Sequence, residues 1–231
     1  LAGGTPTATN VATTGVMTSG SVFQDGVSNT SFTPGSTIYP NKISANTSSG
    51  FSIATWTGTG VAATIAHGLS EAPELVIAKS TTKASTNWAV GVLAGSADFT
   101  DFLILNSDAA IADDPIWNDI APTASLFSIG TDGSVNTSTE EYIAYCFHSV
   151  EGYSKVASYA GNDNADGTFI YLGFKPAFAF VKATSSGGAN RDWTLWDSVR
   201  SPYNQIEAAL QPNTVDAEQT GTSGRGLPID F

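Results

Sequence analysis

Residues that could do chemistry are few in this chain of 231 residues, and their spacing matches no catalytic motif. There are two histidines, His67 and His148, and neither lies near a G-x-S-x-G nucleophile motif. A nucleophile needs a base placed to activate it, so the sequence predicts no hydrolytic triad. We interpret both histidines as surface or capping residues and predict that the chain is not an enzyme.

Two pairs of adjacent acids, Asp113-Asp114 and Glu140-Glu141, are the other candidates for acid–base chemistry. Glycosidases use two carboxylates that flank a cleft. Neighbouring residues on a strand point to opposite faces of the sheet, so neither pair suits that arrangement. We interpret Glu140-Glu141 as a polar turn before a strand and predict no catalytic residue.

The segment 162–167 contains the candidates for a metal site. Asn162, Asn164 and Asp166 alternate before Gly167, as oxygen ligands do at the start of a calcium loop. Position twelve of such a loop would be Gly173, where the motif has Glu. The sequence therefore leaves two interpretations, a calcium site without its last ligand and an Asx-rich turn with no cofactor.

Trp117 is the candidate for ligand binding. It lies in the segment 115–118, Pro-Ile-Trp-Asn, which we predict to be a surface loop. Exposed indole rings form stacking platforms for sugar rings, so Trp117 could bind a host surface glycan. Trp88 and Trp193 lie inside apolar runs, and we expect each to pack within its own domain.

Composition limits the fold and the partners. Hydrophobic residues make up 41% of the chain and charged residues only 13%, so Ser, Thr, Asn and Gly must supply most of the polar surface. These residues favour turns and strands over helices. Nine basic residues against 21 acidic residues give a net charge of −12, which argues against nucleic acid as a partner.

Cysteine usage and hydropathy exclude further classes. The single cysteine, Cys146, allows no disulfide framework or multi-cysteine zinc site, and we expect it to be a small buried residue. No stretch reaches the roughly 20 apolar residues of a membrane-spanning helix, so we predict no membrane insertion. No signal-peptide pattern is visible at Leu1.

Short apolar runs between turn-rich connectors predict an all-β fold of antiparallel β-sandwich-like domains. Residues 1–50 are predicted to be a Gly/Ser/Thr-rich connector with short strands and a hairpin turn at Asp25-Gly26. The only helical pieces predicted are 206–210 and 108–112. The predicted strands after the connector are 51–56, 61–65, 75–79, 88–93, 102–105, 126–129 and 142–147.

An internal repeat with an offset of about 103 residues organises the rest of the chain. Residues 51–156 form the first predicted domain and residues 157–231 the second. Four segments match in order: 54–58 with 157–161, 72–79 with 175–182, 87–90 with 192–195, and 106–108 with 213–216.

The second predicted domain is incomplete, because it contains no counterpart of the segment 126–147. A sheet without its closing strands leaves unpaired backbone groups and an apolar face. We therefore expect either that the natural chain continues or that a neighbouring molecule supplies the strand.

Several motifs resemble a module that is repeated in large tail-fibre-like virion proteins of bacteriophages, often marine ones. They are Ala66-His67-Gly68-Leu69 followed by Ala72-Pro73, the run 142–147, Glu151-Gly152-Tyr153-Ser154-Lys155, Gly173-Phe174-Lys175-Pro176 and Asp197-Ser198-Val199-Arg200. The resemblance covers most of residues 10–231. It implies a structural component of the external virion surface, a tail fibre or spike that adheres to a host.

On this interpretation the partners are other copies of the chain, other virion proteins, and a glycan or protein of the host surface. Three-fold assembly is the expectation that fibres suggest. Two rivals remain open: a capsid decoration or head-fibre protein, and a cellular adhesin or filament subunit completed by donor strands. A polysaccharide depolymerase would need paired carboxylates in a groove, which no part of the sequence indicates.

Overall fold

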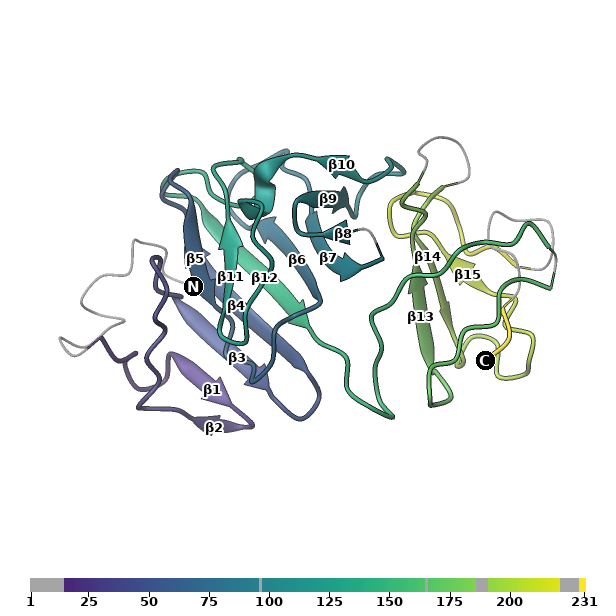
Figure 1. The fold of residues 1–231 in the computed structure, drawn as a ribbon, viewed down its shortest axis with the longest axis horizontal. Helices are drawn as coiled ribbons and strands as arrows, with labels where there is room; N and C mark the ends of the chain where they lie inside the picture. Colours follow the sequence, from purple (N-terminus) through teal and green to yellow (C-terminus); the bar gives the residue numbers. More distant parts are fainter. Residues whose placement is uncertain (1–14, 96, 165, 186–190, 221–228) are drawn as a thin grey trace.

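The computed structural model describes residues 15–231, except 96, 165, 186–190 and 221–228 (Figure 1). The described chain is all-β, and its one helical element is the 3₁₀ turn η1 (Pro115–Trp117). The strands are β1 (Val22–Gln24), β2 (Val27–Ser28), β3 (Lys42–Asn46), β4 (Phe51–Thr57), β5 (Ala63–Ala66), β6 (Leu75–Ser80), β7 (Ala89–Ala94), β8 (Ala97–Asp98), β9 (Asp101–Ile104), β10 (Ala112–Asp113), β11 (Leu126–Ile129), β12 (Glu141–Phe147), β13 (Phe178–Val181), β14 (Thr194–Asp197) and β15 (Ala209–Leu210).

A ten-stranded sheet forms the larger part of the molecule, in the order β10-β9-β7-β6-β12-β4-β3-β1-β2 with β8 beside β7. The central strand β12 pairs antiparallel with β4 on one side and with β6 on the other. Its residues alternate between buried and half-buried, as a strand with one face on a core requires. One parallel pair, β1 with β3, interrupts the antiparallel order.

The two-stranded sheet β5–β11 lies over one face of the large sheet, so the first part of the chain is sandwich-like (Figure 1). Between these layers is the main core. The Trp56 ring stacks on Tyr142 with centroids 5.4 Å apart and meets Phe127 edge-on at 5.7 Å. All three side chains are buried, and full burial of such a side chain stabilises the fold by about 1.5–3 kcal/mol.

The described part of the predicted connector, residues 15–50, belongs to this first sheet, and the boundary predicted at residue 50 is wrong. Strands β1 and β3 pair within the sheet, while Met17 and Val22 are fully buried in the main core. The predicted hairpin turn is present, because Asp25 and Gly26 both have positive φ angles (52° and 81°) between β1 and β2.

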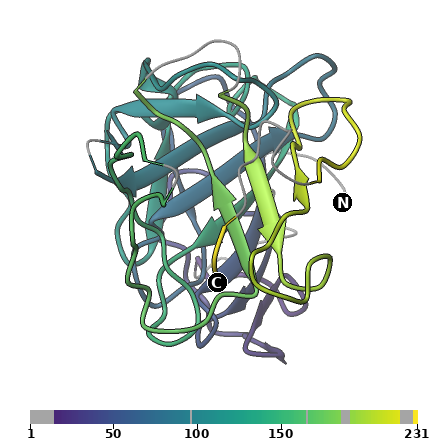
Figure 2. The same cartoon turned by 90° about the vertical axis from the view of Figure 1, so that its right-hand side faces the viewer.

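The three-stranded sheet β13-β14-β15 forms the other end of the molecule, shown in green to yellow in Figure 1 and facing the viewer in Figure 2. It packs on the second face of the large sheet. Trp193 lies with Val90 and Leu103 in one buried cluster, and its Nε1 donates to Ile104 O at 2.8 Å. Trp193 also stacks on Phe180 of its own sheet with ring centroids 4.8 Å apart, so it packs within its predicted domain as expected and joins the two sheets besides.

Strands β6, β7 and β9 correspond to β13, β14 and β15 in order and in register. Each set is antiparallel, with the second strand in the middle. The facing pairs are Ala78–Ala89 and Val90–Leu103 in the first set, and Val181–Thr194 and Leu195–Leu210 in the second. Ala78, Ala89 and Val90 are matched by the sequence repeat with Val181, Thr194 and Leu195.

The two sets also share a side-chain network. Asn106 Oδ1 accepts the Trp88 N–H at 2.9 Å, and its Nδ2 donates to Asn87 Oδ1 at 3.1 Å. Asn213 makes the same two bonds, 2.9 Å to the Trp193 N–H and 2.7 Å to the carboxylate of the preceding residue. In both sheets, an asparagine side chain thus holds the start of the middle strand with the same pair of hydrogen bonds.

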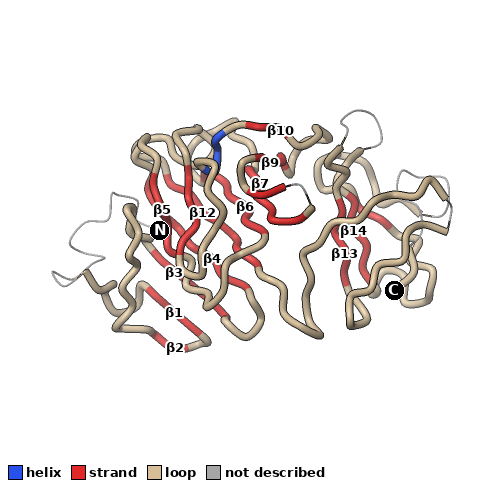
Figure 3. Tube along the Cα trace, viewed as in Figure 1, coloured by secondary structure: helices blue, strands red, loops and turns tan. Residues whose placement is uncertain are grey.

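The correspondence covers three strands and does not extend to the rest of the predicted repeat. Residues 54–57 lie in β4, whereas the matched residues 157–161 form no strand. In Figure 3 the chain from the end of β12 to β13 is loop. For whole domains the repeat of about 103 residues stays a prediction.

Neither predicted helical piece is a helix. Residues 209–210 form β15 and residues 112–113 form β10. Each piece is too short for a helical period to be distinguished from a short strand beside a turn.

Candidate functional site

The two histidines lie inside the first part of the chain and bind backbone groups. His67 Nδ1 accepts the Leu69 N–H at 3.1 Å, which leaves Nε2 as the donor to Thr123 O at 3.1 Å. Burial lowers the pKa of His67 to about 4, so the ring is neutral at pH 7. His148 is also buried, and the prediction of surface histidines is wrong, although His67 does cap a turn.

The two adjacent acid pairs are engaged in structural contacts or exposed. Glu141 Oε1 accepts the Thr57 hydroxyl at 3.0 Å, and Glu140 Oε2 accepts the Thr82 hydroxyl at 2.5 Å. Asp113 lies in the edge strand β10, and the backbone oxygen of Asp114 accepts the Ile116 N–H at 2.7 Å. The contacts of Glu140 and Glu141 tie neighbouring segments together.

Trp117 is fully buried, and the prediction that it presents a surface ring is wrong. The 3₁₀ turn at Pro115 directs the indole inward, where it meets Phe99 at 5.7 Å and Phe127 at 6.4 Å, both edge-on. A ring in this position cannot stack on a sugar. Proline in the sequence signalled a turn but not the side to which the following residue points.

The calcium candidates form a run of Asx turns. Asn162 Oδ1 accepts the Asn164 N–H at 3.1 Å, and Asn164 Oδ1 accepts the Asp166 N–H at 3.0 Å. Asn162 Nδ2 closes the loop on Gly167 O at 2.6 Å. The Asx-turn interpretation is therefore confirmed, while calcium binding stays a prediction. Across the described ranges, no cluster of three or more His, Cys, Asp or Glu side chains is placed to hold a metal.

Cys146 is fully buried in the main core, as predicted. Burial raises the pKa of its thiol to about 12. The thiolate is the reactive form of cysteine, so this residue is not poised for nucleophilic chemistry at neutral pH.

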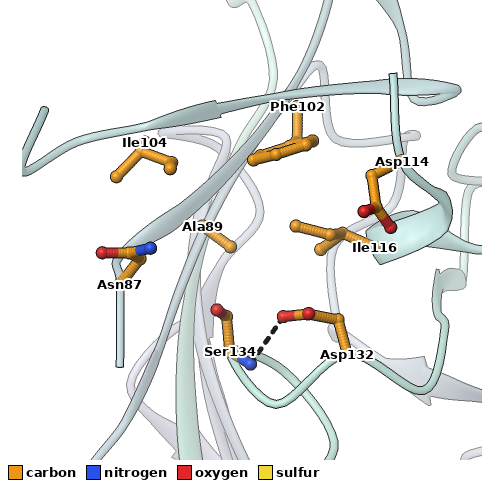
Figure 4. A pocket seen from close by; sticks show the side chains of 8 residues that line it. All are labelled: Asn87, Ala89, Phe102, Ile104, Asp114, Ile116, Asp132 and Ser134. Atoms are coloured by element: carbon orange, nitrogen blue, oxygen red, sulfur yellow. Dashed lines mark hydrogen bonds between the residues drawn. The ribbon is translucent and has the colours of Figure 1, made fainter. Parts of the chain in front are cut away.

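A depression of about 120 Å³ lies where β7 and β9 pass η1 (Figure 4). Its base is apolar, and its polar groups include Asp114 and Asp132. Asp132 is already used, because its Oδ1 accepts the Ser134 N–H at 2.7 Å. The lining residues are Asn87, Ala89, Phe102, Ile104, Asp114, Ile116, Asp132 and Ser134.

This depression is small for a ligand site. Pockets that bind drug-sized molecules occupy about 300–1,000 Å³, so this one accommodates a few water molecules or a single small polar group. Asn87 on its rim is bonded to Asn106 in the network that starts β7. The geometry supports a structural depression beside that network more than an active site.

Comparison with known proteins identifies the chain by family. Residues 5–230 match the profile of DUF7483, described as a domain of unknown function. The chain belongs to the DUF7483 family. No curated protein and no solved structure matches it. No helix in the described part of this DUF7483 chain is long and apolar enough to cross a membrane.

The DUF7483 chain exposes four large aromatic side chains in and before β13. Between β12 and β14 the exposed fractions are 51% for Tyr159, 88% for Phe169, 81% for Tyr171 and 55% for Phe178. We call residues 157–178 the exposed aromatic segment. Aromatic side chains are enriched at protein–protein interfaces. The available signal was a cluster of aromatic residues without the alternation that marks a half-buried strand.

The Asp197-Ser198-Val199-Arg200 motif of the DUF7483 chain locks a turn after β14. Asp197 Oδ1 accepts the backbone N–H groups of Val199 and Arg200, and Arg200 bridges the carboxylates of Asp197 and Glu218 at 2.6 Å each. The hydrogen bond from the Arg200 backbone is the main cause that lowers the pKa of Asp197. The motif therefore shapes a surface turn.

Proposed function

We propose that the chain is a non-catalytic structural module that acts through protein–protein contacts in a larger assembly. The observation that carries this proposal is the exposed aromatic segment, where Phe169 and Tyr171 are more than four-fifths exposed. Large aromatic side chains contribute much of the energy of protein interfaces when they are buried there.

The resemblance to tail-fibre-like virion proteins supports a more specific proposal. We propose a tail fibre or spike on the external surface of a bacteriophage, built from several copies of the chain and adhering to a host surface. A β-fold with few charges suits such an appendage. The net charge of −12 disfavours contact with a nucleic acid backbone.

A direct test is the location of the protein on particles. Virions from the source of the sequence would be purified, analysed by mass spectrometry and labelled with gold-tagged antibodies against this chain. Label on tail appendages is the expected result. Label spread over the capsid would instead support a decoration or head-fibre protein, and absence from the particles would contradict a virion role.

One observation favours a second candidate, a cellular filament subunit. Strand β13 has an open edge, and subunits of some surface filaments are completed by a strand from the next subunit. The same localisation experiment separates the two, because a filament subunit would label cell-surface polymers and not virions.

A further inference from the structure

Strand β6 has partners on both sides, whereas β13 has a partner on one side. β7 pairs with one edge of β6, and β12 pairs along the other from Leu75 to Ser80. β13 pairs with β14, and the described residues place no strand at its other edge. The chain of residues 157–175 passes β13 (Figure 2), and none of its described residues forms a hydrogen bond with it.

The backbone groups at this open edge are those of Phe178 and Phe180. Ser198 N–H donates to Ala177 O at 3.0 Å, so these two residues form a hydrogen-bonded pair. Hydrogen-bonded pairs alternate with non-bonded pairs along an antiparallel ladder. The N–H and C=O groups of Phe178 and Phe180 therefore point away from β14. Unpaired groups in such a row are a template for another strand.

The first sheet shows what lies at the equivalent edge. Leu93 N–H donates to Glu74 O at 2.7 Å, the counterpart of the bond that precedes β13, so the two ladders have the same phase. The groups of Leu75 and Ile77 that point away from β7 meet β12. An equivalent occupant of β13 is thus an antiparallel strand with the alternation of β12.

The exposure of side chains in the second sheet is consistent with the open edge of β13. Trp56 in β4, on the far side of β12, is fully buried, while the matched Tyr159 is 51% exposed. Phe178 is 55% exposed at the start of β13. In the first sheet Tyr142 of β12 and Phe127 of β11 cover the Trp56 ring, whereas Tyr159 and Phe178 are about half exposed.

We propose that the open edge of β13 accepts an antiparallel strand from a neighbouring polypeptide of the assembly, placed on β13 as β12 is placed on β6. This rests on the proposed assembly function. The occupant is an extended segment of about six residues, with small or aromatic side chains toward the core and branched or aromatic side chains on the other face, as in Tyr142–Phe147. Main-chain hydrogen bonds would supply affinity, and alternate side chains specificity.

The test uses the full chain and a fluorescent peptide of residues 140–148, the β12 sequence, with anisotropy as the readout. The N–H groups of Ile143, Tyr145 and Phe147 face β6 in the native sheet, because Thr81 N–H bonds Glu141 O and sets the phase. N-methylation at Tyr145 should therefore weaken binding at least tenfold. N-methylation at Ala144, whose N–H faces the other way, is the matched control and should change binding less than twofold.

Two protein variants locate the bound strand. Phe178→Pro removes an N–H that points to the open edge and leaves the β13–β14 ladder intact, so it should weaken binding at least tenfold. Ser28→Pro is the control. It removes an outward N–H from β2, the open edge at the other end of the large sheet, and should leave binding unchanged.

Binding that depends on the Tyr145 amide and on Phe178 supports the proposal. Absence of saturable binding, or binding that Phe178→Pro leaves unchanged, would overturn it. A dimer in sedimentation that Phe178→Pro abolishes while no peptide binds would overturn it in favour of self-pairing of two β13 edges. If the strand acceptor fails while the protein is still found on virions, the proposed function stands without it.

Discussion

The two sheets of this chain share a three-stranded pattern and differ in what covers it. In the first, β6, β7 and β9 are flanked by β12 and β4 and covered by β5–β11, with a main core that contains Trp56, Phe127 and Tyr142. In the second, β13, β14 and β15 cover a core with three buried residues, Trp196, Ile206 and Ala209. Register and turn chemistry are thus local properties of three strands, whereas a large core needs the strands that only the first sheet has.

One position shows how the sequence adapts to this difference. Gly91 in β7 leaves room for the rings of Phe99 and Trp117, and a Cβ there would lie 2.4 Å from the Phe99 ring. The matched residue of β14 is Trp196, whose own indole fills the smaller second core. The first core is built from rings supplied by other segments, and the second from the strand itself.

Equal contributions of the matched residues Trp56 and Tyr159 to the free energy of unfolding would contradict the difference between the two sheets. Trp56→Ala should lower the free energy of unfolding by about 3–5 kcal/mol, because it removes a fully buried ring from the main core. Tyr159→Ala, at the exposed matched position, should change it by less than about 0.5 kcal/mol. Urea unfolding followed by fluorescence measures both, and similar losses would contradict the assignment of one core and one open surface.

Acid should destabilise the first sheet through His67. The pKa of His67 is lowered to about 4 in the folded chain from 6.5, so the unfolded chain binds the proton more readily between these values. The free energy of unfolding therefore has its full value above pH 6.5. It falls by up to roughly 3 kcal/mol as the pH is lowered toward 4. Unfolding measured from pH 7.5 to 4 checks this against His67→Gln, which should show a shallower dependence. Identical slopes would assign the acid sensitivity to other groups.

Gly91→Ala should destabilise the chain by about 1–3 kcal/mol, because the added methyl group overpacks the Phe99 and Trp117 rings. Gly161→Ala is the control, since no atom lies within 4 Å of a Cβ built there. Thermal unfolding distinguishes them. A neutral Gly91→Ala would mean that the first core relaxes more easily than its ring contacts indicate.

The smallest expected effects test the equivalence itself. Asn106→Ala and Asn213→Ala each remove two hydrogen bonds that start the middle strand, so each should cost about 1 kcal/mol. Urea unfolding should give losses that agree within about 0.5 kcal/mol. A large loss for one and none for the other would show that the shared geometry lacks a shared energetic role.

Strands made of continuous apolar runs could be predicted in the first part of the chain, in the large sheet and in the small sheet β5–β11. The run 126–129 matches β11 at both ends, and 142–147 misses only the first residue of β12. The Asp25-Gly26 turn was readable because both residues adopt the positive φ angles that such a turn requires.

The site could be predicted much less well. Trp117 lies in a predicted surface loop, but the direction of a side chain after a turn depends on packing, here with Phe99 and Phe127. The sequence did not indicate that residues 15–50 belong to the first sheet, because this depends on the long-range pairing of β1 with β3. The open edge of β13 and the exposed rings of Phe169 and Tyr171 emerged only from the fold.

Native-state amide hydrogen exchange on the isolated chain tests the central claim most directly. The N–H groups of Leu75 and Ile77 face β12, whereas those of the matched Phe178 and Phe180 face the open edge. We predict strong protection for the first two amides and exchange close to the unstructured rate for the second two. Equal protection of all four would contradict the account, because it would mean that the edge of β13 is already paired.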